Sequence, residues 1–238
     1  MSNKFRAELL CIALVVCQSA PVVAGAKIVQ LEGEVKIRRG LEENWEWAKP
    51  GMPLEEIDTI LTGENGAVVL AFDDDGRFKL GGNSVLDVAD LRKISEQELF
   101  LILMSQKISR LKPAGGSVPL RIGEVSTIRG RAYEGQTESP ATASAWWRRE
   151  VNAAQALLMQ DLLTNAAVKW HRIREKFPAQ ADCGEVSFFL AQTLEQLRQA
   201  GQARDEYQRS LQQARTQECR DEETAHRTAM ALEKLKQQ

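Results

Sequence analysis

The stretch AVVLAFDDDGRFKL, residues 67–80, contains the clearest structural signal in the chain. On both sides of its centre, apolar side chains recur at every second position, which is the spacing of a strand with one buried face. The Asp-Gly pair at positions 75 and 76 suits a tight turn whose backbone needs a positive φ. We therefore predict a β-hairpin with strands over Val68–Phe72 and Arg77–Leu80. The acidic run at 73–75 is interpreted as a solvated turn, because it lacks the ligand spacing of a calcium loop.

Short strand signals continue on both sides of this hairpin, and turn residues separate them. The expected strands are Lys27–Leu31, Glu34–Arg38, Ile57–Thr62, Ala67–Phe72 and Val85–Val88. Gly33 and the Gly63–Gly66 turn each lie between two of these strands and indicate further hairpins. Strands spaced this closely predict a mainly β domain, either a β-solenoid or a sandwich of short strands.

The segment from Glu98 to Leu111 fits two structures, an amphipathic helix or a buried strand followed by a second strand. Its centre, Leu99–Met104, is continuously apolar, so periodicity does not distinguish the two. We favour the strand because of the family resemblance that the neighbouring motifs indicate, and the helix stays open as the alternative.

Several motifs in this half of the chain occur in a characteristic order. They are Gly33-Glu34-Val35, Trp45 with Ala48, Gly51-x-x-Leu54, Asp58-x-Ile60-x-Thr62-Gly63, Ala67-x-x-x-Ala71-x-Asp73, Ser84-x-Leu86 and Val125-Ser126-Thr127-Ile128-Arg129-Gly130. Together they resemble the FecR domain over residues 27–134. The resemblance implies a β-rich extracytoplasmic module, which in the sensors that name the family relays an envelope signal to a sigma factor.

The second half of the chain has a helical composition. Residues 27–138 contain 13 glycines, whereas residues 139–238 contain two. The polar stretch 135–145 is interpreted as a linker between two domains, 27–134 and 146–238. The expected helices are Trp146–Leu163, Ala166–Phe177, Cys183–Ala200, Gln202–Ala214 and Asp221–Lys236, with stop signals at Pro178 and Gly201.

The helical pairs repeat at a fixed spacing. Ala154, Leu157, Ala166, Trp170, Ile173 and Pro178 have counterparts 37 residues later in Ala191, Leu194, Ala203, Tyr207, Ser210 and Arg215. This pattern resembles a tetratricopeptide repeat over residues 147–236. The resemblance implies an all-α domain of stacked helical hairpins, with the last helix as a cap.

The N-terminus has the features of an export signal. Lys4 and Arg6 precede an apolar run over Leu9–Val16, and Ala24 and Ala26 supply the small residues of a cleavage site. We expect residues 1–26 to be a signal peptide and the mature chain to be periplasmic or otherwise exported, without stable membrane insertion. An uncleaved membrane anchor is the alternative, although polar residues interrupt the apolar segment.

Cleavage would leave Cys183 and Cys219 as the cysteines of the mature chain. In an oxidising compartment such a pair is a disulfide candidate, and two unpaired thiols are the alternative. Neither cysteine has a histidine nearby in the sequence, which argues against a catalytic thiol. The pair is also too small a ligand set for a metal site.

Composition and motifs argue against several classes of function. The net charge of −2 gives no basis for non-specific nucleic-acid binding. No catalytic motif or metal-spaced cluster is visible, so we expect no enzyme, no cofactor and no metal. His171 and His226 are expected at exposed helix positions. Trp45 and Trp47 lie on one face of a strand, where they either pack in the core or against the neighbouring domain, or form a glycan platform.

These expectations indicate an exported, non-enzymatic cell-envelope protein that acts as a binding or scaffold protein. Stacked helical hairpins present a concave surface suited to an envelope protein partner. The residues expected on that surface are Arg148, Gln155, Phe188, Gln192 and Glu195. Phe188 would be its exposed apolar anchor. The alternatives are a carbohydrate or cell-wall binding module that uses the β domain, and envelope signal sensing of the FecR type.

The predicted signal peptide can be tested on the protein recovered from the cell envelope. We expect Lys27 to be its first residue, because Ala24 and Ala26 direct cleavage after position 26. Intact-mass measurement combined with N-terminal peptide sequencing gives the position directly. Retention of the apolar segment would instead establish an anchored protein.

Overall fold

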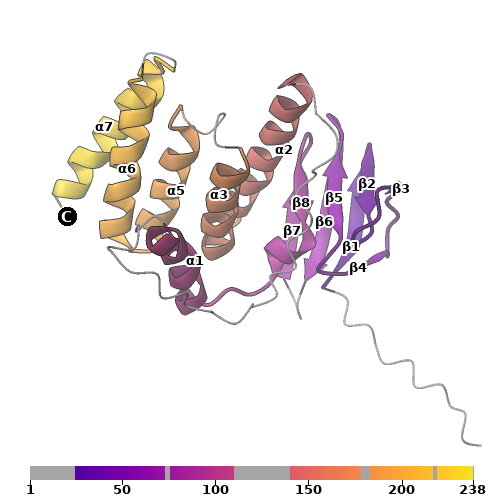
Figure 1. The fold of residues 1–238 in the computed structure, drawn as a ribbon. Coiled ribbons are helices and arrows are strands. Elements are labelled where there is room, and N and C mark those ends of the chain that lie inside the picture. The colour runs from indigo at the N-terminus through magenta and orange to yellow at the C-terminus, as the bar shows by residue number, and fades with distance from the viewer. Residues whose placement is uncertain (1–24, 73–75, 110–139, 178–182, 217–218, 238) are drawn as a thin grey trace, which may run out of the picture.

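The structure is a computed structural model that describes residues 25–72, 76–109, 140–177, 183–216 and 219–237. Within these residues, eight strands are followed by six α-helices (Figure 1). The strands are β1 (Ala26–Glu32), β2 (Val35–Arg38), β3 (Trp45–Trp47), β4 (Pro53–Leu54), β5 (Thr59–Thr62), β6 (Ala67–Phe72), β7 (Gly76–Leu80) and β8 (Val85–Asp87). Most of the predicted signal peptide, the acidic run at 73–75 and the FecR-like segment at 125–130 lie outside the described residues.

The strands form two antiparallel sheets of four strands each, with the orders β4-β1-β6-β7 and β3-β2-β5-β8. Ile28 and Leu70 of the first sheet and Ile37 and Ile60 of the second are fully buried and belong to one apolar core. The mainly β character predicted for this half is therefore confirmed, and its strands lie in two layers around a common core.

Only one of the three predicted hairpins is present among the described strands. β6 pairs with β7, with Leu70 opposite Phe78, as the alternating pattern predicts. β1 pairs with β4 and β6, whereas β2 pairs with β3 and β5, so the chain crosses between the sheets at Gly33. β5 and β6 also lie in different sheets. Both of these hairpin predictions are wrong, because a glycine turn signal does not distinguish a hairpin from a crossing between two layers.

The two crossing turns pack against each other, and glycine makes this possible. Gly33 has a φ of 61°, and a Cβ atom at this position would lie 2.2 Å from the carbonyl oxygen of Asn65. A Cβ atom at Gly66 would lie 2.2 Å from the carbonyl oxygen of Glu34. The Gly63 N–H donates a hydrogen bond of 2.8 Å to that same Glu34 oxygen. Side chains at these glycines would therefore separate the turns that connect the sheets.

The helices follow the sheets in the predicted order. They are α1 (Glu96–Ser109), α2 (Pro140–Met159), α3 (Leu163–Lys176), α5 (Glu185–Gln196), α6 (Ala200–Ala214) and α7 (Glu222–Lys236). Figure 1 shows α2, α3, α5, α6 and α7 following one another away from the sheets. α2 begins at Pro140, so residues 140–145 of the predicted linker are helical, and proline is tolerated in the first turn of a helix.

The segment favoured as a strand is the helix α1, so that prediction is wrong. The Glu98 N–H donates a hydrogen bond of 3.2 Å to the Ser95 hydroxyl, which caps the start of the helix. Ser95-x-x-Glu98 is the sequence signature of a capping box, which marks the start of a helix. The prediction relied on the apolar run that follows and did not use this signature. α1 packs against α3, with Leu99 buried and Leu101 exposed.

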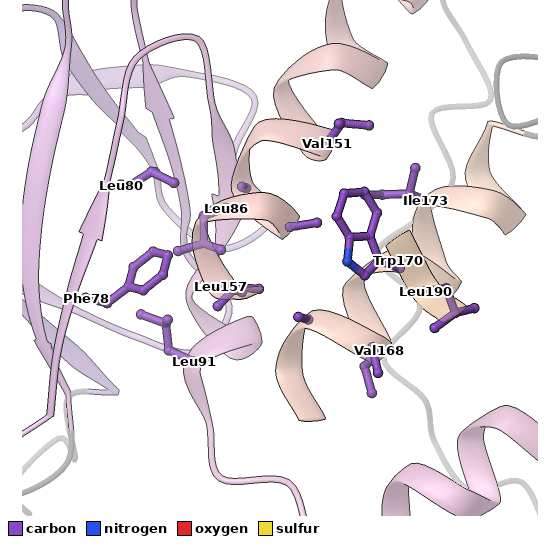
Figure 2. Packing of buried hydrophobic residues seen from close by; sticks show 14 of the residues in the cluster. Phe78, Leu80, Leu86, Leu91, Val151, Leu157, Val168, Trp170, Ile173 and Leu190 are labelled. Carbon is purple, nitrogen blue, oxygen red and sulfur yellow. The ribbon is translucent and has the colours of Figure 1, made fainter. Parts of the chain in front are cut away.

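One apolar core extends from the sheets into the helices. Leu80 and Leu86 of the sheets and Leu157 of α2 are fully buried members of the same cluster, which continues to Trp170 of α3. Figure 2 shows this continuity, with Leu157 placed between the residues of the strands and Trp170. The two predicted domains therefore share a core in the described part of the chain.

Side-chain amides complete the contact between strands and helices. The Gln160 amide donates to the Lys79 carbonyl (2.8 Å) and accepts from the Lys79 N–H (2.7 Å). β7 is the last strand of its sheet, so this amide takes the place of a neighbouring strand. Asn165 of α3 likewise donates to the carbonyl oxygens of Asp90 and Arg92.

A buried ion cluster also joins the two halves. The Lys169 ammonium of α3 lies 2.7 Å from Asp90 Oδ2 and 2.5 Å from Glu150 Oε2. Asp90 belongs to the short 3-10 helix η1 (Val88–Leu91) and Glu150 to α2, so the cluster connects three elements. Only 3% of the Lys169 side chain and 2% of the Asp90 side chain are exposed. Arg172 and Lys176, on the same face of α3 but more exposed, contact Asp90 at 2.7 Å and Glu150 at 2.9 Å, respectively.

The cluster shifts the pKa of its members in different directions. Burial opposes the charged form of Lys169, but Asp90, Glu150 and Asp87 outweigh burial and raise the pKa of its ammonium. Burial raises the pKa of Asp90, and Lys169 counters only part of that effect. Burial also opposes the charged form of Asp87, yet Lys169 and a hydrogen bond from Thr59 lower the pKa of this carboxyl. The ammonium therefore favours the charged form of Asp87 and offsets part of the effect of burial on Asp90.

Substitution of Lys169 by Met should destabilise the protein strongly. Lys169→Met leaves Asp90 and Glu150 buried without their shared cation, and we expect the free energy of unfolding to fall by about 3–5 kcal/mol. Urea denaturation followed by circular dichroism measures this loss. The exposed Lys93 offers a matched control, and Lys93→Met should change stability by no more than about 0.5 kcal/mol. Equal denaturation midpoints for the two variants would contradict the role given to Lys169.

Candidate binding surfaces

The two helical hairpins, α2 with α3 and α5 with α6, have the same burial pattern. All the following residues expose 2% or less of their surface: Ala154, Leu157, Ala166, Trp170 and Ile173 in the first hairpin, and Ala191, Leu194, Ala203, Tyr207 and Ser210 in the second. The residues that the sequence pairs at a spacing of 37 are therefore core residues in both hairpins.

The turns inside the two hairpins also correspond. Asp161 and Arg198, again 37 residues apart, both have a φ of 60°. The residue after each of them donates a backbone hydrogen bond to a leucine carbonyl five residues earlier. Gly201, the predicted turn, lies instead in the first turn of α6. The prediction missed the turn because a residue other than glycine adopts the left-handed conformation there.

The same spacing extends to α7. Thr228 follows Ala191 by 37 residues and is also fully buried, where its hydroxyl lies 3.1 Å from that of Ser210. The 37-residue spacing therefore relates buried positions of α2, α5 and α7, namely Ala154, Ala191 and Thr228. We call the surface that these three helices form together the repeat face.

Ion pairs connect neighbouring helices of the repeat face. Arg148 of α2 contacts Glu185 of α5 at 3.3 Å, and Lys234 of α7 contacts Glu195 of α5 at 3.2 Å. Glu195 also accepts a hydrogen bond of 2.9 Å from the Tyr207 hydroxyl. Burial and this carboxylate together raise the pKa of the Tyr207 hydroxyl. Arg148 and Glu195 each have a partner on a neighbouring helix, and their role in partner binding stays a prediction.

Phe188 is not the exposed anchor that the sequence predicted. It exposes only 8% of its surface, and its ring centre lies 5.8 Å from that of Tyr207. The Arg227 guanidinium of α7 covers the ring at 4.5 Å. The prediction is wrong because α7 packs over Phe188, and the sequence pattern alone did not place α7 beside α5.

The remaining predicted residues of this face are two glutamines. Gln155 of α2 and Gln192 of α5 are 37 residues apart and half-buried. Within the described residues, neither side-chain amide has a hydrogen-bond partner. Among the predicted residues of the repeat face, they are the two whose polar groups have no partner in the described part of the chain.

Trp45 and Trp47 lie on the same face of β3, opposite Arg38 and Lys36 of β2. The Trp45 ring makes an edge contact with Trp146 of α2, with ring centres 6.3 Å apart. Trp47 is 59% exposed. Packing against the neighbouring half, one of the two alternatives, therefore applies to Trp45 and not to Trp47.

The predicted disulfide between Cys183 and Cys219 is present, with the Cα atoms 5.2 Å apart. It joins the residues just before α5 and α7, the corresponding helices of neighbouring units. The alternative of two unpaired thiols is wrong for this structure.

His171 is buried rather than exposed, with its Nε2 atom 3.8 Å from Glu175. His226 is exposed, as predicted. In the described ranges, no group of three or more His, Cys, Asp or Glu side chains is placed to hold a metal ion. None of the described helices is both long and apolar enough to span a bilayer.

Sequence reasoning missed several residues of these surfaces. Arg227 and Lys234 escaped notice because α7 was interpreted as a cap and not aligned with α5. Extending the 37-residue spacing by one unit, from Ala191 to Thr228, would have placed both of them beside α5. Nothing in the sequence signalled that Trp146 would meet Trp45, because this contact depends on how α2 packs beside the sheets.

No protein-family model and no curated protein matches the chain. A solved structure that resembles part of it is a "cell surface anchoring domain" of 31% sequence identity, with a TM-score of 0.26. The alignment covers 27% of this chain and 84% of that domain. A TM-score of 0.26 does not establish a common fold, so the FecR and tetratricopeptide resemblances stay predictions.

Removal of the disulfide should loosen α7. For Cys183→Ala combined with Cys219→Ala, we expect the free energy of unfolding to fall by about 2–4 kcal/mol, because the unfolded chain gains freedom. Urea denaturation measures this loss, and amide hydrogen exchange should show faster exchange in Glu222–Lys236. The reduced wild-type protein should behave like the variant. Unchanged stability and exchange would show that packing alone holds α7.

Proposed function

We propose that this chain is an exported, non-enzymatic cell-envelope scaffold protein that binds a protein partner through the repeat face. The observation that supports this function is the equivalence of α2, α5 and α7, in which Ala154, Ala191 and Thr228 are buried at the same position. Stacked helical units present corresponding helices as one extended surface. A peptide or helix of a partner can contact several units of such a surface at once.

Export is supported by the disulfide between Cys183 and Cys219. Disulfides form and persist in oxidising compartments outside the cytosol. The signal-like N-terminal sequence agrees with this location.

Gln155 and Gln192 are the residues that we assign to partner recognition. A glutamine amide donates and accepts hydrogen bonds at the same time, so it can pair with both backbone groups of a peptide unit. Gln160 does this within the chain, where it pairs with the N–H and the carbonyl of Lys79. Gln155 and Gln192 offer the same chemistry to a partner at positions one unit apart.

Arg148 adds a positive charge to the same face of α2 as Gln155, two helical turns earlier. Its side chain is 60% exposed, and its contact with Glu185 at 3.3 Å is an ion pair at the surface. Such pairs contribute little to stability, so an acidic group of a partner can compete for the arginine. We therefore expect the partner segment to carry a carboxylate near the backbone groups that bind the glutamines.

A photo-crosslinking amino acid at position 192 tests the proposal in cells that make the protein. We expect a discrete covalent adduct with one envelope protein, identified by mass spectrometry. Gln155→Ala should lower the yield of that adduct by about fivefold, the effect of losing roughly 1 kcal/mol of hydrogen bonding.

The matched control places the same crosslinker at Arg204, which is exposed on α6 and outside the repeat face. This position should give no adduct with the same protein. Adducts of equal yield from both positions, or from neither, would contradict the proposed function.

A further inference from the structure

Three tryptophans lie together where β3 meets α2, and the proposed function does not use them. We call Trp45, Trp47 and Trp146 the tryptophan cluster. Trp45 and Trp47 share one face of β3, and Trp146 contacts Trp45 from α2. Two chain segments far apart in the sequence therefore contribute to one aromatic surface.

Each ring of the tryptophan cluster has a cation over it. The distances from charge to ring centre are 5.4 Å for Arg38 over Trp45, 4.7 Å for Lys36 over Trp47 and 5.9 Å for Arg149 over Trp146. Cations in this position are attracted by the ring and stay close to its surface. A ligand that meets the rings therefore also meets positive charge.

The positive charge at the cluster is only partly neutralised. Lys36 contacts Glu34 at 2.9 Å. Arg38 and Arg149 form no ion pair within the described residues, and the Arg38 Nη2 instead donates to the Thr59 hydroxyl at 3.1 Å. Two of the three cations thus have no carboxylate partner in the described part of the chain.

The acidic residue between the two tryptophans does not face the cluster. Glu46 points to the opposite side of β3, because successive side chains alternate along a strand. There it accepts a hydrogen bond of 2.7 Å from Arg39. The surface around Trp45 and Trp47 therefore keeps its positive character.

We propose that the tryptophan cluster binds a glycan that carries carboxylate groups. The apolar faces of sugar rings stack on the tryptophan faces that the cations leave open, above all on exposed Trp47, and the carboxylates pair with the cations. Trp45 and Trp47 are separated along β3 by about 6.6 Å, so neighbouring sugars of one chain can each contact a ring. Trp47 has the central role, because its exposed ring contributes little to the core.

The observations favour a glycan over a nucleic acid, although stacking bases also use tryptophan and arginine. The whole chain has a net charge of −2. Nucleic-acid binding depends on many phosphate contacts and needs a broad basic surface. Three cations beside three rings suit instead a ligand with widely spaced charges.

Calorimetric titration of the full chain with soluble muropeptides, which combine N-acetylated sugar rings with carboxylates, tests this proposal. Trp47→Ala should weaken binding by about tenfold, which corresponds to roughly 1.4 kcal/mol. Trp47→Phe should weaken it less, because an aromatic face remains. Phe100→Ala provides the matched control, since Phe100 is a half-exposed aromatic residue on α1, and should bind like the wild type. Unchanged circular dichroism and melting temperature show that the variants are folded.

Three further ligands show which chemical groups of the muropeptide the tryptophan cluster recognises. Chitooligosaccharides provide the sugar rings without carboxylates, polyglutamate provides the carboxylates without rings, and a teichoic acid provides phosphates. We expect each to bind at least about tenfold more weakly than muropeptides. Equal or tighter binding of any one of them, or full retention of muropeptide binding by Trp47→Ala, would overturn the proposal. Gln192→Ala should leave muropeptide binding unchanged, so the test is independent of the partner proposed for the repeat face.

Discussion

The buried ammonium of Lys169 determines how the helices sit on the sheets. It lies between Asp90 of η1 and Glu150 of α2 and contacts both carboxylates. Burying these charges is costly, and a buried ion pair adds little net stability over an apolar contact. Its effect is on geometry, because each displaced arrangement would leave a charge without a partner. The pairing of Gln160 with β7 and the packing of Leu157 in the shared core belong to the same contact between helices and sheets.

The helical units also depend on what covers their two ends. A stack of repeated units exposes an apolar surface at each end unless another element covers it. At the first end the sheets contribute Leu80 and Leu86 to the same core as α2. At the other end α7 packs over α5 and α6, where the disulfide fixes its start and Lys234 pairs with Glu195. The same helix buries Phe188. The packing of α7 therefore both covers this end of the stack and removes the exposed apolar anchor that the sequence predicted.

Local signals in the sequence predicted the elements better than their connections. The alternation on both sides of Asp-Gly gave the β6–β7 hairpin, and the 37-residue spacing gave the core of both helical hairpins. Gly33 and Gly66 were identified as turn residues, but their role in bringing two crossings together depends on contacts between distant segments. The burial of Phe188 and His171 escaped prediction for the same reason, because a helix pattern shows periodicity and not the neighbour that covers each face.

α2 shows how one short segment can serve several surfaces. Successive residues of a helix are rotated by about 100°, so Arg148 points away from Trp146 and Glu150, which lie one turn apart on the same side of α2. Trp146 meets Trp45 on β3, Arg148 meets Glu185 on α5, and Glu150 meets Lys169 in the buried cluster. The tryptophan cluster and the repeat face are therefore attached to the same rigid helix, which the ion cluster holds against the sheets. Under the two proposals, a glycan bound at the first surface and a protein bound at the second would be held at a fixed distance by α2.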